Sequence, residues 1–188
     1  MGTDITTRAN TISLIGMPGA GKSTTGVLLA KLCGLRFVDT DLDIQVHAGA
    51  TLQQILEHDG HLRLRAIEQD VLLKVDLAGA VIATGGSVPY SDTVMQRLKA
   101  AGPVVYLEAD LATLERRVAA APLRGIACDS EQSFADIFAE RTPLYRRYAD
   151  LCVDAAGEAP EAVAVRILQW LAQPARSSGD PDPDASGR

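Results

Sequence analysis

Cysteine is scarce in this sequence, which argues against disulfide bonds and cysteine-based metal sites. The three cysteines among 188 residues, Cys33, Cys128 and Cys152, are far apart and form no Cys-x-x-Cys pair. An odd number at such spacing argues against a disulfide framework and against a metal site built on cysteine. The pattern is typical of a protein kept in a reducing compartment, so we expect a cytoplasmic location.

Long apolar runs and an excess of basic charge are also missing. No apolar stretch approaches the roughly 18 residues that a membrane-spanning helix needs, and residues 1–10 are too polar for a secretory signal. We therefore expect no membrane partner. Lys and Arg number 18 against 24 Asp and Glu, which gives a formal net charge of −6. This balance argues against a nucleic-acid binder, although a few local cations can still bind one small anion.

Composition divides the chain into a core and two polar ends. Residues 174–188 are rich in Pro, Asp, Ser and Gly and contain no apolar side chain larger than alanine, so we expect a disordered tail. We also expect residues 1–10 to be a disordered head. Residues 11–173 contain no linker or repeat, and we expect them to fold as one domain.

Short apolar runs alternate with helical patterns throughout this core. Five runs have the character of buried strands, at residues 11–15, 35–38, 80–84, 103–107 and 151–153. Helical patterns mark a short helix capped by Thr51 and residues 22–33, 61–77, 91–101, 110–121, 133–148 (with a break or kink near Pro143) and 160–171. The alternation predicts an α/β fold in three layers, a five-stranded parallel sheet flanked by helices.

A glycine-rich segment lies between the first expected strand and the first expected helix. Residues 16–23, Gly-Met-Pro-Gly-Ala-Gly-Lys-Ser, match the phosphate-binding P-loop pattern in full. Glycines let successive N–H groups face phosphate oxygens, and the helix N-terminus adds positive potential. Lys22 would neutralise the β and γ phosphates of ATP, and Ser23 would offer its hydroxyl to Mg²⁺. The residues expected to bind the nucleotide here are Gly19, Ala20, Gly21, Lys22, Ser23 and Thr24.

Three aspartates, Asp39, Asp41 and Asp43, follow the second expected strand. Ligands of open α/β sheets bind beyond the carboxyl ends of the strands, where these residues fall. Along an extended segment Asp39 and Asp41 would point the same way. Asp39 would then support Mg²⁺, and Asp41 would accept hydrogen bonds from substrate hydroxyls. The alternative is that one aspartate caps a helix while its neighbours are solvated, and this alternative is strongest for Asp43.

With these motifs the sequence resembles the shikimate kinase family, small P-loop kinases that phosphorylate the 3-hydroxyl of shikimate with ATP. The resemblance covers about residues 11–171. After the phosphate loop and the aspartates come Arg65 with Glu68, the turn at Gly85 and Gly86, Arg124, and residues 140–145, Glu-Arg-Thr-Pro-Leu-Tyr. It implies a P-loop kinase fold with a mobile lid at about residues 121–133, and a protein that is a monomer.

The resemblance also implies a role for each matching residue. Lys22, Asp41 and Arg124 would carry catalysis, with Asp41 as the base and Arg124 reaching the transferred phosphoryl group from the lid. Arg117 would pack on adenine. The substrate would be a small hydroxylated carboxylic acid bound by Asp41, Arg65, Gly85, Gly86, Arg124 and Arg141.

The expected arginine contacts agree with the chemistry of the side chain. A planar guanidinium suits bidentate binding of a carboxylate. For Arg65 the alternative is a surface residue, solvated or paired with Glu68 three residues on. Arg124 lies in a loop of about a dozen residues without apolar periodicity, as expected for a lid that excludes water from phosphoryl transfer.

The substrate region departs from the family pattern at several positions. Ser87 stands where a third glycine is usual, Leu56 and Leu64 replace phenylalanines, and His61 replaces a glutamate. The lid arginine is followed by Gly-Ile where Pro-Leu is usual. Shikimate is the leading substrate. A different hydroxy acid, such as quinate or homoserine, is an alternative, and so is a nucleotide-binding regulatory module without an acceptor.

Overall fold

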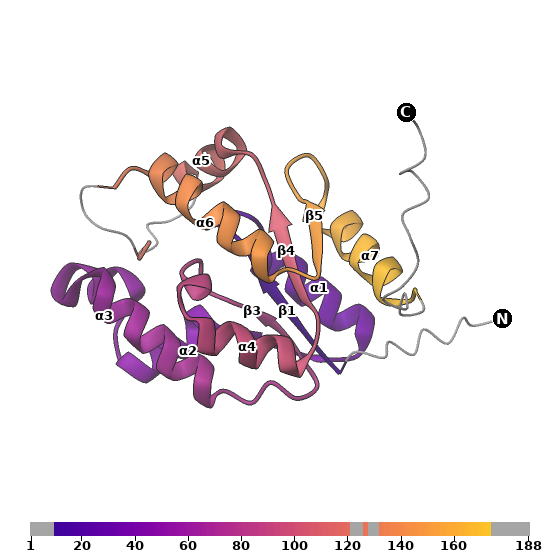
Figure 1. Cartoon of the computed structure of the whole chain (residues 1–188), viewed down its shortest axis with the longest axis horizontal. Helices are drawn as coiled ribbons and strands as arrows, with labels where there is room; N and C mark the ends of the chain where they lie inside the picture. The colour runs from indigo at the N-terminus through magenta and orange to yellow at the C-terminus, as the bar shows by residue number, and fades with distance from the viewer. Residues whose placement is uncertain (1–9, 121–125, 128–131, 174–188) are drawn as a thin grey trace.

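A parallel sheet of five strands forms the centre of the molecule (Figure 1). The computed structural model describes residues 10–120, 126–127 and 132–173, so the expected head, the tail and most of the expected lid, Arg124 included, lie outside the described residues. The strand order is β2-β3-β1-β4-β5, with every pairing parallel. The strands are β1 (Thr11–Ile15), β2 (Arg36–Asp39), β3 (Ala80–Ala83), β4 (Val104–Glu108) and β5 (Leu151–Asp154). The predicted α/β fold is confirmed.

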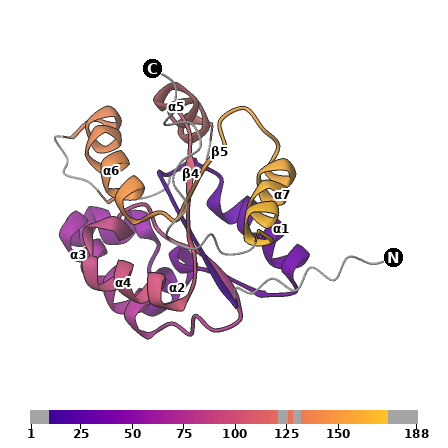
Figure 2. The same ribbon diagram turned by 45° about the vertical axis from the view of Figure 1, so that its right-hand side comes forward.

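Helices cover both faces of the sheet (Figure 2). On one face α1 packs against α7, and on the other α4 packs against β1 and α6 against β4. The helices of these two layers are α1 (Lys22–Cys33), α7 (Pro160–Leu171), α3 (Leu52–Lys74), α4 (Asp92–Ala101) and α6 (Phe134–Tyr148). Two short helices follow β4 and β2 in the chain: α5 (Leu111–Ala119), which contacts α6, and α2 (Thr40–Ala48), which contacts α3.

Local sequence signals explain where these elements begin and end. All residues of β1 and β3 are buried, which is why both read as continuous apolar runs rather than alternating ones. Thr51 and Gln54 form the expected capping box at the start of α3, and Ser133 and Asp136 form another at α6. Gly34 ends α1 in the left-handed conformation, at φ 67°.

Two elements were not expected from the sequence. Helix α2 was not expected, because it buries only Thr40 and Ile44 and leaves Leu42 and Val46 exposed, so it has no apolar stripe. A short 3₁₀ helix, η1 (Val88–Tyr90), precedes α4 and was also not expected. The two helices expected around residues 51–77 are present as the two parts of α3, on either side of Gly60, where a φ of 79° interrupts the helical backbone.

Helix α6 is a single element that contains Pro143, where a break or kink was expected. A proline inside a helix removes one backbone hydrogen bond. Buried neighbours on both sides of it, Arg141, Thr142 and Tyr145, hold the helix against the sheet through this point. Packing therefore outweighs the local cost of the proline.

The topology fixes where a ligand is expected. Strands β1 and β3 are neighbours, but the helices that follow them, α1 and α4, lie on opposite faces of the sheet. A crevice forms beyond the carboxyl ends of two such strands. Within the described ranges of the chain, no helix is long and apolar enough to cross a membrane.

Candidate active site

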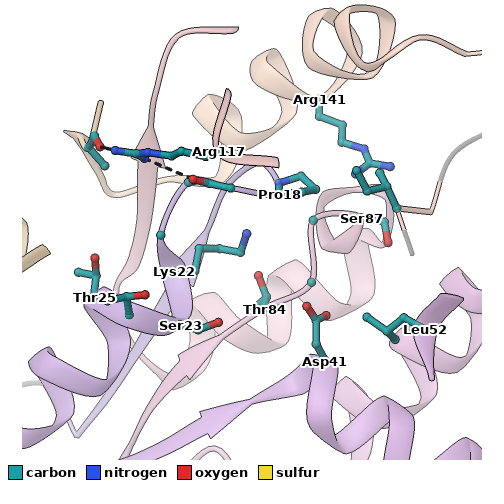
Figure 3. Close-up of a pocket in the computed structure, with 18 of the residues that line it drawn as sticks. Pro18, Lys22, Ser23, Thr25, Asp41, Leu52, Thr84, Ser87, Arg117 and Arg141 are labelled. Carbon is teal, nitrogen blue, oxygen red and sulfur yellow. Dashed lines mark hydrogen bonds between the residues drawn. The ribbon is translucent and has the colours of Figure 1, made fainter. Parts of the chain in front are cut away.

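A cavity of about 380 Å³ opens beyond the carboxyl ends of the strands (Figure 3). Its lining comes from the phosphate loop, α2, α3, the turn after β3, α5 and α6. The expected site residues that line it are Gly19, Ala20, Gly21, Lys22, Ser23, Thr24, Asp41, Gly85, Gly86, Arg117 and Arg141. Asp39 and Arg65 do not line it, and Arg124 lies outside the described residues.

The phosphate loop has the backbone that its glycines allow. Gly19 and Gly21 have φ of 85° and 93°, a region that other residues seldom adopt. Gly21 caps α1 without any side-chain hydrogen bond, so the first turn of the helix presents its N–H groups to the cavity. Lys22 Nζ reaches back over the loop and donates to the carbonyls of Gly16 (2.8 Å) and Met17 (3.0 Å). The arrangement places a positive charge above a row of donors, which is an anion-binding geometry.

Arg117 joins the phosphate loop to the segment between β5 and α7. Its guanidinium donates to the carbonyl of Gly19 at 3.3 Å and to the carbonyls of Ala155 and Ala156 at 2.8 and 3.0 Å. The last two residues lie between β5 and α7. These contacts fix a planar cation beside the phosphate loop, with Pro160 and Val163 also in the cavity wall.

The aspartates after β2 do not share one direction, as an extended strand would have given. Asp39 is the N-cap of α2, and its carboxylate accepts a hydrogen bond from the backbone N–H of Asp41 at 3.1 Å. Asp41 lies in the first helical turn and lines the cavity. Asp39 caps the helix instead of extending the strand, because its carboxylate satisfies a backbone N–H that the start of the helix would otherwise leave unpaired. Asp43 lies in the same turn, where burial and the neighbouring Asp39 raise its carboxyl pKa.

The turn after β3 brings Asp41 close to the backbone of Gly85. The N–H of Gly85 donates to the hydroxyl of Thr40 at 3.1 Å, which ties the start of α2 to the end of β3. A Cβ added to Gly85 would lie 3.1 Å from Asp41 Oδ1 and 2.2 Å from Glu68 Oε1. The glycine therefore permits two carboxylates to approach the main chain of this turn.

Glu68 is the charged residue whose place the sequence reading did not find. It is 4% exposed, lines the cavity, and accepts a hydrogen bond from the hydroxyl of Ser87. The pKa of its carboxyl is raised to about 7, chiefly by burial and also by Asp41, although Ser87, Arg141 and Lys22 act in the opposite direction. Its position one turn after the buried Leu64 is the signal that could have placed it on the covered face of α3. Arg65 and Glu68 form no ion pair among the described residues.

The two expected carboxylate-binding arginines converge on one carbonyl oxygen. Arg141 is 1% exposed and donates through Nη2 to the carbonyl of Ala127. Arg65 donates to the same oxygen at 3.3 Å, and its guanidinium lies 3.9 Å above the ring centroid of Tyr90. Arg65 lines a second cavity, which shares Glu68 and Ser87 with the first. The Arg65 side chain is half-buried and held by Ala127 and Tyr90 in the wall of the second cavity, rather than free in solvent.

The positions that depart from the family pattern take different places. Leu64 is 3% exposed and lines the cavity, so a phenylalanine here would occupy cavity space. The hydroxyl of Ser87 is engaged by Glu68. Leu56 and His61 are partly exposed and line none of the cavities described above.

The fold and cavity together define a class. A phosphate loop on β1, a carboxylate on α2 and arginines facing the same space are the parts of a P-loop phosphotransferase acting on a small anionic molecule. The comparisons make the class specific. The family model for shikimate kinase matches residues 18–172, and the chain belongs to that family.

Curated relatives support the assignment over nearly their full length. "Shikimate kinase 2" of Enterobacter sp. (strain 638) is 38% identical over 167 residues, which is 85% of this chain and 94% of that protein. The shikimate kinase of Pseudomonas aeruginosa (strain LESB58) is 39% identical over 161 residues, covering 84% of this chain and 94% of the relative.

Solved structures agree with the sequence comparison. The shikimate kinase from Acinetobacter baumannii, in complex with shikimate, superposes with a TM-score of 0.78 at 31% identity and covers 88% of this chain and 94% of its own. The shikimate kinase from Aquifex aeolicus gives a TM-score of 0.73 at 29% identity, with 85% and 95% covered. The predicted family and its P-loop fold are confirmed.

Proposed function

We propose that this chain transfers the γ-phosphoryl group of ATP to the 3-hydroxyl of shikimate. The observation that carries the proposal is that one cavity is lined both by the phosphate loop and by Asp41 and Arg141. Lys22 and Arg117 lie on the side of the phosphate loop, Arg141 lies across from them, and Asp41 lies below (Figure 3). A phosphoryl group held at Lys22 would face an acceptor held between Asp41 and Arg141.

The nucleotide side supplies charge stabilisation. The donors of the loop and Lys22 would hold the β and γ phosphates, and Arg117 would face the base. Because phosphoryl transfer spreads negative charge over the moving group, fixed cations accelerate it chiefly by electrostatics. Arg124 belongs to this part of the proposal through the family resemblance.

The acceptor side supplies orientation and a proton acceptor. In the transfer, the 3-hydroxyl oxygen forms a bond to the γ phosphorus while the bond between that phosphorus and the β–γ bridging oxygen breaks, releasing ADP. The hydroxyl proton passes to a base, and the carboxylate of Asp41 is suited to this role by its place in the cavity. Arg141, with Arg65, would hold the carboxylate of the acceptor.

Mg²⁺ is the expected metal, and the donors present fit it. Ser23 lines the cavity with a hydroxyl, one of the hard oxygen ligands that Mg²⁺ takes. Asp39 caps α2 and would act on the ion through water, which suits an ion that keeps several waters. When bound, the ion would neutralise charge on the β and γ phosphates.

The test is turnover with a defined product. Purified protein is incubated with ATP, Mg²⁺ and shikimate, ADP is followed by a coupled assay, and the phosphate position is read by ³¹P and ¹H NMR. We expect stoichiometric ADP and shikimate 3-phosphate. ATP binding without ADP formation in the presence of shikimate would refute the proposal and would favour the regulatory module.

A different hydroxy acid is the second candidate, because Leu64 lines the cavity where the family pattern has a phenylalanine. The same assay with quinate and homoserine decides between them. A higher kcat/KM for either one than for shikimate would change the proposed substrate and leave the P-loop chemistry in place.

A further inference from the structure

Tyr90 stands between the two arginines that face the acceptor. The Arg65 guanidinium carbon lies 3.9 Å from the centroid of its ring, and the Arg141 guanidinium carbon lies 5.3 Å from it. Arg141 Nε also donates to the Tyr90 hydroxyl at 3.3 Å. One aromatic side chain thus contacts both cations, through its face and through its oxygen.

The same two arginines share a second partner, the carbonyl oxygen of Ala127. Two guanidinium groups that reach one oxygen lie close together, and like charges in a buried setting repel. Arg141 is 1% exposed, so water does little to screen it. Something in the protein must offset the repulsion, and Tyr90 offers both an electron-rich face and a hydroxyl acceptor to these groups.

Tyr90 is itself fixed by rigid surroundings. It ends η1 (Val88–Tyr90), in which Val88 and Pro89 are buried, and its backbone N–H donates to the carbonyl of Ser87 at 3.1 Å. The next residue, Ser91, caps α4. The backbone of Tyr90 is therefore held on both sides by short, hydrogen-bonded structure, which gives its side chain a fixed attachment point beside the more flexible arginine side chains.

We propose that Tyr90 is a positioning residue for carboxylate recognition, which holds Arg65 and Arg141 so that both donate to one oxygen. This inference rests on the proposed function for the identity of the acceptor. The carbonyl of Ala127 marks the point on which the two donors converge. A substrate carboxylate carries a full negative charge and binds guanidinium more strongly than a neutral carbonyl does, so it can compete for these donors.

Two features separate this role from general packing. The ring lies closer to Arg65 (3.9 Å) than to Arg141 (5.3 Å), and the hydroxyl accepts from Arg141. Tyr90→Phe therefore removes the hydroxyl contact alone, and Tyr90→Leu removes the hydroxyl and the ring. Tyr90 does not line the cavity that holds the phosphate loop, so nucleotide binding does not depend on it. A carboxylate-specific effect is therefore the signature to seek.

The experiment compares shikimate with its carboxamide, which keeps the hydroxyls and loses the negative charge. Steady-state kinetics are measured for wild type, Tyr90→Phe and Tyr90→Leu, with ATP KM measured in parallel and folding checked by thermal unfolding. Tyr148→Phe is the matched control: its hydroxyl donates to Asp92 at 2.8 Å, and it lines neither cavity. Wild-type turnover of shikimate tests the proposed function by itself, and only the ratios between variants test Tyr90.

We expect Tyr90→Leu to raise the shikimate KM about tenfold, the loss of a partly buried cation–π contact, with kcat changed less. The carboxamide KM should change by no more than about twofold, because a neutral ligand gains little from aligned cations. Tyr90→Phe should fall between wild type and Tyr90→Leu, and Tyr148→Phe should match wild type. The proposal would be overturned if folded Tyr90→Leu raised the KM values for shikimate and the carboxamide equally. It would also be overturned if the KM for ATP rose in parallel, or if the KM for shikimate did not change.

Discussion

The hydroxyl of Ser87 donates a hydrogen bond to the buried carboxylate of Glu68. Both side chains lie under the turn after β3, at 6% and 4% exposure. The second carboxylate oxygen of Glu68, Oε1, has no hydrogen-bond partner among the described residues. A carboxylate with one donor in a buried place retains an appreciable desolvation cost, and protonation is the simplest way to relieve it.

The first prediction concerns the pH dependence of stability. Burial raises the pKa of Glu68 from 4.5 to about 7, so between these values the folded chain binds a proton at Glu68 that the unfolded chain has released. The contribution of Glu68 to the free energy of unfolding is therefore fully present below pH 4.5. About 3 kcal/mol of it is lost as the pH rises to 7. Glu68→Gln keeps an acceptor for Ser87 and cannot ionise. Urea unfolding of both proteins across this range should show the variant gaining on wild type as the pH rises; parallel curves would show that Glu68 does not titrate there.

The second prediction concerns the glycine that faces Glu68. A Cβ at Gly85 would lie 2.2 Å from Glu68 Oε1 and 3.1 Å from Asp41 Oδ1, and the buried Glu68 has little room to retreat. We expect Gly85→Ala to lower the free energy of unfolding by about 1–3 kcal/mol through overpacking, and to reduce turnover by displacing Asp41. Gly157→Ala is the control, because no atom lies within 4 Å of its Cβ position. Denaturant unfolding gives the free energy of unfolding of both variants, and equal values for Gly85→Ala and Gly157→Ala would contradict the steric argument.

The architecture was predictable from the sequence because it depends on strong local signals. The apolar runs of β1 and β3 and the glycines of the phosphate loop each have a physical requirement that few other residues meet. Helix α2 gave no such signal, since it buries only Thr40 and Ile44. The helix determines the geometry of the site, because Asp39 is its N-cap and, of these two aspartates, only Asp41 lines the cavity.

The acceptor side was predictable only in part, because its contacts join distant segments. Arg65 and Arg141 could be named from their motifs, but their shared oxygen belongs to Ala127, and the ring between them belongs to Tyr90. Alanine contributes through its backbone, so its residue type carries no information about this contact. Such contacts follow from the packing of α3, η1 and α6 and have no counterpart in local spacing.

The third prediction assigns Arg117 to the nucleotide. Its guanidinium holds three backbone carbonyls around the phosphate loop and the segment before α7. We expect Arg117→Ala to raise the KM for ATP about tenfold while the KM for shikimate changes little. Arg116→Ala, an exposed neighbour on α5, should leave both unchanged. Titration with a fluorescent ATP analogue checks the binding step directly, and a rise confined to the shikimate KM would contradict the assignment.

The fourth prediction concerns Lys22. Its ammonium group donates to Gly16 and Met17 within the loop and lines the cavity. Removing it should lower kcat by about 10²- to 10³-fold, the range for losing one preorganised donor to developing charge. Lys31→Ala, on an exposed part of the same helix, is the control. Single-turnover measurements separate chemistry from product release, and a Lys22→Ala variant that is folded yet within a few-fold of wild type would exclude Lys22 from the transfer.

The fifth prediction separates two aspartates in one helical turn. Asp41 lines the cavity beside Gly85, whereas Asp43 does not line it. Asp41→Asn keeps the shape of the side chain and removes the charge that accepts the hydroxyl proton, so we expect kcat to fall at least about 10²-fold. ATP binding should persist, because the phosphate loop is unaltered. Asp43→Asn should retain turnover near that of wild type. Measuring kcat together with ATP affinity in both variants decides the matter: wild-type kcat in Asp41→Asn, or equal losses in the two, would remove Asp41 from its role as the base.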